Sequence, residues 1–185
     1  MMPGGHLATS VALAGVAYAT TGSVETAAGC CAGGFLIDVD HYLDYLIFEK
    51  QWRRPSPVDF LRYYFSSSPR RHVLPLHSVE FMTVLLGLIL VHPWPLLVGY
   101  WVGALMHLIF DVLVNGEVGL KNPVRFYFFA YRARYRFAAK HLIRAEAPVH
   151  TSRRPIRDFF RWKPAPEQPT AARLPENALN RVISP

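Results

Sequence analysis

The distribution of positive charge is the feature that most constrains this sequence. Residues 1–49 and residues 72–120 contain no Lys or Arg, whereas six lie within residues 50–71 and the remaining fourteen begin at Lys121. The 185-residue chain is 51% hydrophobic and only 18% charged, which is too apolar for an ordinary soluble surface. Two long cation-free blocks in such a chain indicate a small multi-spanning membrane protein.

Four apolar segments occupy the two cation-free blocks. Residues 7–20 and 26–37 are rich in small residues and predict a helical hairpin, although each is shorter than the roughly 20 residues that cross a bilayer. Residues 73–91 and 95–114 are each about as long as a span, and a proline-containing break separates them. We therefore predict an all-α fold, a small helical membrane bundle of about four apolar helices.

Three further segments complete the expected organisation. Residues 42–71 are polar and aromatic and contain prolines and arginines, which predicts an ordered cytoplasmic surface loop. Residues 121–145 mix Lys and Arg with Phe and Tyr, a composition typical of an interfacial helix on anionic headgroups. Residues 147–185 are Pro-rich and lack hydrophobic periodicity, so we expect a mobile tail after a membrane domain of residues 1–146.

An alternating path through the four apolar segments places every Lys and Arg on the side where the chain starts. The turns on the opposite side, Thr21–Glu25 and His92–Trp94, contain no Lys or Arg. Because cytoplasmic loops of membrane proteins carry an excess of these residues, we expect the cation-rich side and both termini to face the cytoplasm.

Histidine and aspartate residues gather on the same side of this path. Each apolar segment begins or ends there with a side chain that can bind a metal. Imidazole nitrogens together with carboxylate oxygens suit a hard or borderline cation, with zinc as the first candidate and manganese as the second. The predicted metal ligands are His6, Asp38, His41, His77, His107 and Asp111.

The pair His107 and Asp111 provides the clearest local pattern. A spacing of four residues places both side chains on one face of a helix, within reach of a common ion. A carboxylate inside a membrane helix costs roughly 2.5–3.5 kcal/mol unless it is compensated, and a divalent cation would compensate it. An interhelical hydrogen-bonded pair is the alternative explanation of this spacing.

Two further carboxylates are candidate catalytic residues, as acceptors of a proton. Asp40 lies in Asp38-Val39-Asp40-His41, where three potential ligands in four residues favour a metal site over a solvated turn. Glu80 follows His77 by about one helical turn, close to the membrane interface. The alternative role for Glu80 is to pair with an arginine from a later loop.

Four short motifs occur in order along the chain: Gly5-His6-Leu7, Asp38-Val39-Asp40-His41, His72 with His77-Ser78, and His107 with Asp111. In this order they resemble the motifs of the bacterial inner-membrane metal-dependent hydrolase family. That family is distantly similar to zinc-dependent phospholipase C and the zinc single-strand nucleases. The resemblance covers residues 4–114 and implies phosphoester hydrolysis in a bacterial inner membrane.

The third motif departs from the pattern of the family. Members commonly have His-Arg-x-x-Thr-His, where residues 72–77 of this chain are HVLPLH. His72 precedes Pro75, so we expect it in the loop, behind the ligands or facing solvent rather than coordinating. The departure indicates a subgroup with its own substrate.

These features predict a membrane-embedded, metal-dependent hydrolase that acts on a phosphoester, such as a lipid headgroup, at the cytoplasmic interface. The metal would polarise a phosphoryl oxygen and acidify a bound water. The arginine-rich loop and the basic segment would attract the anionic substrate and anionic membrane lipids.

Three other classes of function remain open at this point. The chain could be a noncatalytic anchor whose metal staples the bundle and whose basic C-terminal region recruits a partner. An ion pathway is disfavoured because it needs polar residues across the full membrane thickness. A nucleic-acid binder is disfavoured because no recognisable binding module accompanies the basic segment.

Overall fold

A computed structural model describes residues 3–66, 69–115, 119–144, 157 and 159–160. Within these ranges the chain forms helices and connecting loops, with two isolated β-bridges and no strand. The prediction of an all-α fold is therefore confirmed for the described residues. The tail expected at residues 147–185 lies, apart from three positions, outside them.

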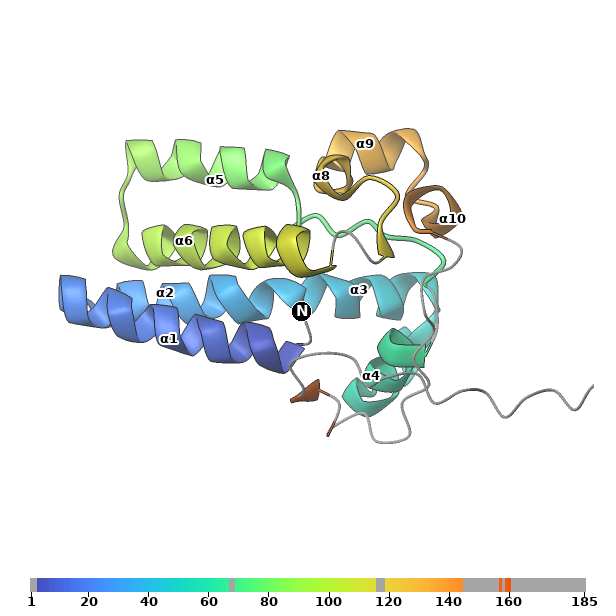
Figure 1. Ribbon diagram of the computed structural model, residues 1–185, viewed down its shortest axis with the longest axis horizontal. Coiled ribbons are helices and arrows are strands. Elements are labelled where there is room, and N and C mark those ends of the chain that lie inside the picture. Colours follow the sequence, from blue (N-terminus) through green and yellow to red (C-terminus); the bar gives the residue numbers. More distant parts are fainter. Residues whose placement is uncertain (1–2, 67–68, 116–118, 145–156, 158, 161–185) are drawn as a thin grey trace, which may run out of the picture.

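Four long helices form the body of the molecule. They are α1 (Pro3–Thr21), α2 (Val24–Phe35), α5 (Val79–Val91) and α6 (Pro95–Phe110). The four run lengthwise beside one another, and successive helices run in opposite directions (Figure 1). The start of α1, the end of α2, the start of α5 and the end of α6 consequently lie toward the same end of the body.

Short helices gather at that end (Figure 1). On one side of it lie α3 (Val39–Phe48) and α4 (Pro57–Ser66), and on the other lie α8 (Pro123–Phe126), α9 (Phe129–Arg134) and α10 (Ala139–Leu142). The expectation of a loop at residues 42–71 is therefore wrong for most of that segment. Pro57 occupies the first position of α4, where the N–H that proline lacks is not needed, so it delimits a helix instead of preventing one.

The segment of residues 121–145, here called the basic aromatic segment, also differs from its expected form. It contains three short helices instead of one interfacial helix. Arg136 and Phe137 both have positive φ angles, of 53° and 59°, which turn the chain between α9 and α10. The segment thereby folds back on itself.

Glycines allow α2 and α6 to pack backbone against backbone. A Cβ atom on Gly29 or Gly33 of α2 would collide with the carbonyl oxygen of Leu96 or Tyr100, respectively. In the other direction, a Cβ on Gly99 or Gly103 of α6 would collide with backbone oxygens of α2. Each helix thus carries two glycines four residues apart at the contact, an arrangement typical of closely packed membrane helices.

The helix α5 begins later than the sequence indicated. We expected an apolar helix from residue 73, but residues 73–78 form a loop and Ser78 caps the helix, accepting a hydrogen bond from the backbone N–H of Phe81. Leu74 has a positive φ of 43°, which is incompatible with a helix at that position. His77 therefore lies in a loop immediately before α5.

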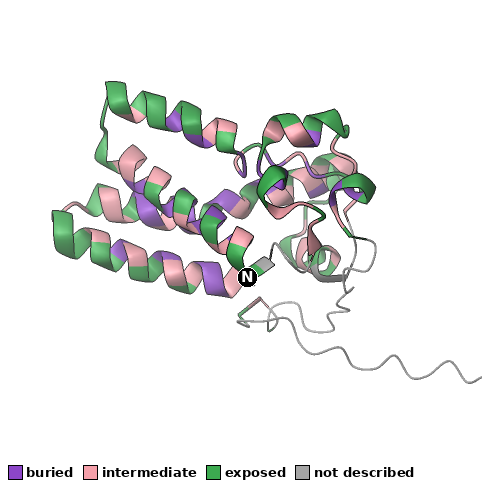
Figure 2. Cartoon of the chain, turned by 45° about the horizontal axis from the view of Figure 1, so that its top comes forward, coloured by how far each residue is buried: buried purple, intermediate pink, exposed green. Residues whose placement is uncertain are grey.

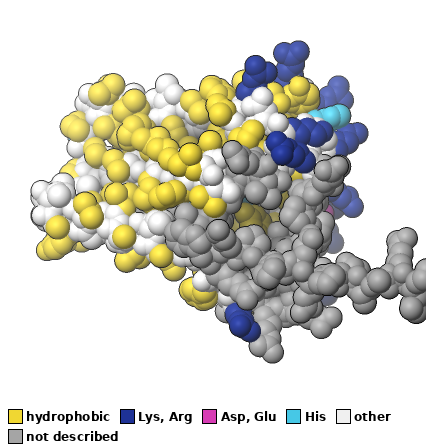
Figure 3. All heavy atoms as spheres, viewed as in Figure 1, with side chains coloured by type: hydrophobic (Ala, Val, Ile, Leu, Met, Phe, Trp, Pro, Cys, Tyr) yellow, Lys and Arg dark blue, Asp and Glu magenta, His cyan; other side chains and the backbone are white. Residues whose placement is uncertain are grey.

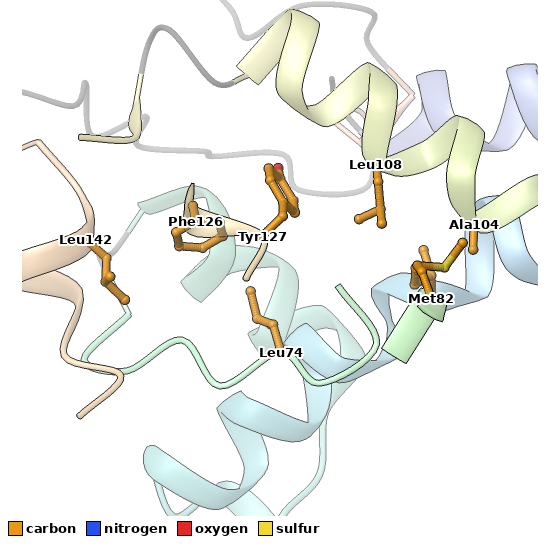
Figure 4. Packing of buried hydrophobic residues seen from close by; sticks show 8 residues of the cluster. Leu74, Met82, Ala104, Leu108, Phe126, Tyr127 and Leu142 are labelled. Carbon is orange, nitrogen blue, oxygen red and sulfur yellow. The ribbon is translucent and has the colours of Figure 1, made fainter. Parts of the chain in front are cut away.

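A hydrophobic core joins the long helices to the short ones (Figure 4). Leu74 lies in this core with Phe126 and Tyr127 from the α8 region and Leu108 from α6. Next to them the guanidinium of Arg132, which is fully buried, donates hydrogen bonds to the carbonyl oxygens of Leu74, His77 and Phe126. The core and this arginine fix the loop that carries His77.

Large apolar side chains are exposed along the long helices. Figure 2 shows that most of α5 is exposed, and Val84, Leu88, Leu90 and Val91 are its most exposed large apolar residues. Among the described residues, one helical stretch, Pro95–Val114, has both the length and the apolarity to cross a membrane, and α5 is apolar but shorter.

Candidate metal centre

Six His and Asp side chains converge where the long helices meet α3. They belong to six different segments of the chain. These segments meet because the long helices alternate in direction, which returns their polar ends to one region. His6 belongs to α1, Asp38 to the 3-10 turn Leu36–Asp38, His41 to α3, His77 to the loop before α5, His107 to α6 and Asp111 to the π-helical turn Asp111–Asn115. These are the six ligands predicted from the sequence.

Four ligand atoms lie close together, one from each of His77, His107, Asp38 and Asp111. The Nε2 atoms of His77 and His107 are 3.2 Å apart, and Oδ1 of Asp38 lies 3.4 Å from each of them. Oδ2 of Asp111 lies 3.4 Å from Nε2 of His107 and 3.9 Å from Nε2 of His77. Atoms that bind a tetrahedral zinc ion at roughly 2.0–2.2 Å are about 3.3–3.6 Å apart. Four of the five distances, those of 3.2–3.4 Å, are therefore close to the spacing of ligand atoms in a zinc site, and the fifth, 3.9 Å between His77 and Asp111, is slightly longer.

His6 and His41 extend the cluster beyond these four residues. Nε2 of His6 lies 3.2 Å from Oδ1 of Asp111, and the His6 ring stacks on His107 with 3.9 Å between centroids. Nε2 of His41 lies 3.8 Å from Oδ1 of Asp38. The six residues thus also divide into two groups of three possible ligands: His6, His107 and Asp111, and Asp38, His41 and His77.

The hydrogen bonds that His77 and His107 make through Nδ1 determine whether Nε2 of each neutral ring carries a hydrogen or a lone pair. Nδ1 of His107 donates to the carbonyl oxygen of Gly34 at 2.8 Å, and Nδ1 of His77 donates to Oδ2 of Asp40 at 3.1 Å. Because both partners only accept, each Nδ1 carries a hydrogen and each neutral ring presents a lone pair at Nε2. When both rings are neutral, two imidazole lone pairs and two carboxylate oxygens face one another, an arrangement that protons on the imidazoles or a bound metal ion would stabilise.

Asp40 lies behind His77 and does not face the ligand atoms. Its Oδ2 accepts hydrogen bonds from the backbone N–H groups of Leu76 and His77, at 3.1 and 3.3 Å. The carboxylate is fully buried. Such an arrangement fixes the tautomer and the orientation of a metal-binding imidazole, so the geometry gives Asp40 a positioning role.

Glu80 is not among the residues that the structure brings together here. Its two carboxylate oxygens accept hydrogen bonds from the backbone N–H groups of Phe129 and Ala130, at 2.7 and 2.9 Å. Those groups belong to the first turn of α9, where backbone N–H groups have no partner within the helix. Glu80 therefore caps α9 and ties it to α5.

Charge within the cluster shifts the pKa values of its loop residues. Burial alone would lower the pKa of His77, but the carboxylates of Asp40 and Asp38 raise it to about 9. Burial alone would raise the pKa of Asp38, but His107 and His77 lower it well below its usual value. Without a metal, protons on imidazole thus neutralise the carboxylates, and a metal ion would displace those protons.

The sequence did not indicate two residues that support the site. The hydroxyl of Tyr127 hydrogen-bonds Asp111, and burial is the largest cause of the raised pKa of Tyr127, which keeps this hydroxyl protonated. Arg132 holds the carbonyl oxygen of His77 at 2.9 Å. Both lie in the basic aromatic segment, and no spacing rule connects that segment with the ligands.

His72 is buried beside the cluster. Its backbone N–H donates to the carbonyl oxygen of Phe137, and its Nε2 is a buried atom with no hydrogen-bond partner among the described residues. Burial, with smaller contributions from neighbouring His41 and Arg132, lowers the pKa of His72 to about 3. The side chain is therefore neutral and does not face solvent.

No protein-family model, no curated protein and no solved structure matches this chain. The chemistry of the centre is therefore inferred from its own atoms. The described residues include a largely buried cluster of His and Asp side chains that can hold a metal ion.

Proposed function

We propose that this protein is a membrane-embedded, metal-dependent hydrolase that cleaves a phosphoester at the level of the cytoplasmic headgroups. One observation carries the proposal: the Nε2 atoms of two imidazoles and two carboxylate oxygens lie within 3.2–3.4 Å of one or more of the others. Once the imidazoles release their protons, such a set of ligand atoms binds a divalent cation, and the His and Asp composition suits zinc before manganese.

Hydrolysis of a phosphoester suits this cluster. The reaction forms a bond between phosphorus and a water oxygen and breaks the bond to the alcohol oxygen, which leaves with a proton. A bound divalent ion supplies polarisation of the phosphoryl oxygen and a more acidic water. The chain's own residues orient the ligands, with Asp40 behind His77, Gly34 behind His107 and Tyr127 on Asp111.

The cluster has one comparatively open side. The Asp38 and His41 side chains are 28% and 17% exposed, whereas those of His6, His77 and His107 are at most 3% exposed. A substrate would therefore approach past Asp38 and His41. The buried ligands on the far side would keep their geometry while it binds.

The surface of the molecule supports a membrane location. Figure 3 shows apolar side chains along the long helices and Lys and Arg side chains at the end that carries the short helices. The two sequence blocks that contain these long helices have no Lys or Arg. Because basic residues are concentrated on the cytoplasmic side of membrane proteins, we place the cation-rich end and the metal centre at the cytoplasmic face of a bacterial inner membrane.

A noncatalytic metal staple is the second candidate, and one observation favours it. Asp38, His77, His107 and Asp111 alone have nearly the spacing of a closed tetrahedral site, and closed four-ligand sites are usually structural. The two groups of three ligands instead provide two sites that each leave a position for water, as catalytic sites do. Metal stoichiometry separates the two functions, with one ion expected for a staple and two for the hydrolase.

The test uses the full chain purified in detergent. We expect two zinc ions per chain and hydrolysis of phosphomonoesters or phosphodiesters in a panel that includes phospholipid vesicles. Replacing His107 with Ala should remove bound zinc and activity together. His92→Ala is the matched control, because His92 is an exposed histidine in the turn between α5 and α6.

The possible outcomes distinguish the proposals. A protein that binds one zinc ion tightly and cleaves no member of the panel would support the staple and contradict the hydrolase. Unchanged zinc content in the His107→Ala variant would reject the metal centre itself.

A further inference from the structure

The outer face of α3 is apolar, although the inner face of the same helix carries a predicted metal ligand. Among residues 29–49, the exposed residues are all large and apolar, and 45–60% of their surface is accessible: Leu36, Val39, Leu43 and Ile47. Their spacing of three or four residues places them in one line along the helix, which we call the α3 stripe. A helix that faced water on this side would carry polar side chains there.

The acidic side chains of this segment point to the inside of the molecule. Asp40 is fully buried, and Asp38 belongs to the metal cluster. The carboxylate of Asp44 accepts hydrogen bonds from the backbone N–H groups of Val73 and Leu74, at 2.7 and 3.3 Å. Among residues 29–49, all of which the structure describes, no charged side chain is therefore exposed.

The neighbouring helix α4 has a different exposed surface. Asp59 and Arg62 are exposed on it and form an ion pair at 3.0 Å. Such an exposed pair suits water, in which both charged groups remain hydrated. The two helices thus face different surroundings, water at α4 and an apolar medium at α3.

Basic and aromatic side chains follow the end of the α3 stripe. In the 3-10 turn Gln51–Arg53, Trp52 is 61% exposed and the guanidinium of Arg53 lies over its ring, 4.9 Å from the centroid. Lys50 and Arg54, on either side of this turn, are also exposed. Trp close to Lys and Arg is typical of the boundary between hydrocarbon and headgroups, where anionic lipids attract the cations. This sequence of surfaces fits a lipid bilayer better than an apolar protein partner.

The helix α3 also supplies the length that α2 lacks. α2 has 12 residues, which is too few to cross a bilayer. α3 follows it after a single 3-10 turn and continues in the same direction (Figure 1). Residues 24–48 together exceed the roughly 20 residues that a span requires. The apolar surface of the long helices thus continues along α3, beyond residue 37, where the sequence placed the end of the second apolar segment.

We infer that the α3 stripe contacts the acyl chains of the cytoplasmic leaflet and that residues 50–54 contact its headgroups. The partner of this surface is thus an anionic phospholipid bilayer. The inference rests on the membrane location in the proposed function and extends it to a helix that carries the predicted ligand His41. On the α3 side, lipid therefore extends past the metal centre toward the cytoplasm.

The first experiment measures which medium surrounds the α3 stripe. Spin labels are attached to Val39→Cys, Leu43→Cys or Ile47→Cys in full-length protein that also carries Cys30→Ala and Cys31→Ala. The protein is reconstituted in nanodiscs that contain phosphatidylglycerol and phosphatidylcholine. Collision rates with oxygen, which partitions into acyl chains, are compared with those of a water-soluble nickel chelate. We expect the oxygen-to-nickel ratio to be highest at Val39 and to fall toward Ile47, because α3 runs toward the headgroups.

Two reference positions provide the matched controls. Leu88→Cys, on the exposed face of α5, reports the ratio in lipid, and His141→Cys, at an exposed residue of α10, reports the ratio in water. We expect the ratio at Leu43 to be several-fold higher than at His141 and similar to that at Leu88.

Each outcome decides the question. A ratio at Leu43 that equals the ratio at His141, while Leu88 reports lipid, would overturn the inference and leave the membrane location intact. A water-like ratio at Leu88 as well would reject the membrane location itself. Low collision rates with both reagents at Leu43 would show that a protein partner or a second copy covers the stripe, which would also overturn the inference.

A second measurement needs no introduced cysteine. Tryptophan fluorescence of wild type and Trp52→Phe is recorded in nanodiscs whose lipids carry bromine in the acyl chains close to the headgroups, because bromine quenches nearby tryptophan. We expect the emission that wild type has and the variant lacks to be quenched, and more strongly when the discs contain phosphatidylglycerol. Absence of quenching would place Trp52 in water and overturn the inference. Quenching that does not depend on phosphatidylglycerol would overturn the assignment of anionic headgroups to residues 50–54.

Discussion

The Nε2 atoms of His77 and His107 face each other at 3.2 Å, although the two residues belong to different elements of the fold. Each ring is fixed from behind by a group that only accepts, the Asp40 carboxylate for His77 and the Gly34 carbonyl for His107. The rings therefore cannot turn their N–H groups toward each other without losing a buried hydrogen bond. The fixed orientation of both rings directs their Nε2 atoms toward a common point, where they could bind a cation together.

Replacing Asp40 with Asn should weaken zinc binding without removing a ligand. The amide cannot stabilise His77 as a carboxylate does, and loss of such a partner typically weakens metal affinity by about 10- to 100-fold. Competition with a zinc-binding dye measures this change. Asp59→Asn on α4 is the control, because Asp59 is exposed and pairs with the neighbouring Arg62 on the same helix. Equal zinc affinity in the two variants would contradict the positioning role of Asp40.

Replacing Glu80 with Gln should affect stability more than activity. Glu80 accepts hydrogen bonds from two N–H groups at the start of α9, and loss of a helix cap costs about 0.5–2 kcal/mol. Thermal unfolding should therefore occur at a lower temperature, while hydrolysis per zinc-loaded chain remains unchanged. A large loss of activity with wild-type stability would instead support the proton-accepting role expected from the sequence.

The convergence of the six His and Asp side chains could be predicted because it depends on simple periodicities. When successive long helices alternate in direction, every second connection between them lies at the same end of the bundle. The positions of His6 and His107 relative to their helix ends were therefore sufficient to predict that the two side chains converge. No detailed contact had to be known. The same reasoning assigned Asp40 a proton-accepting role and could not show that it lies behind His77, since the direction of a carboxylate depends on the 3-10 turn between α2 and α3.

The errors arose where tertiary contacts override local composition. Prolines and arginines in residues 42–71 indicated a loop, yet aromatic packing between Tyr45 and Phe60 accompanies two helices there. Glu80 carried a local helical signal that suggested the site, but its partners lie about fifty residues later in α9. Arg132 looked like one cation of an interfacial helix, whereas its burial among three carbonyl oxygens could be known only from the fold.

Replacing Gly33 with Ala should destabilise the protein, whereas replacing Gly87 with Ala should not. A Cβ at Gly33 would collide with the Tyr100 carbonyl oxygen, and such overpacking typically costs about 1–3 kcal/mol. Gly87 has nothing within 4 Å of an added Cβ, and alanine favours a helix by about 0.5–1 kcal/mol. Thermal unfolding in detergent compares the two. Zinc affinity should fall only in Gly33→Ala, since α2 and α6 position Asp38 and His107.

The buried, neutral His72 should make the protein less stable in acid. The pKa of its imidazole is about 3 in the folded chain and about 6.5 when unfolded, so only the unfolded state takes up a proton between these values. Stability conferred by His72 is therefore present above pH 6.5 and is lost as pH falls, by roughly 1.4 kcal/mol per pH unit. Between pH 7 and pH 5, wild type should lose about 2 kcal/mol more than His72→Leu. The two proteins share every other titrating group, so the difference between their unfolding free energies isolates His72. A difference that does not change with pH would show that this imidazole is already protonated, or is solvated, in the folded protein.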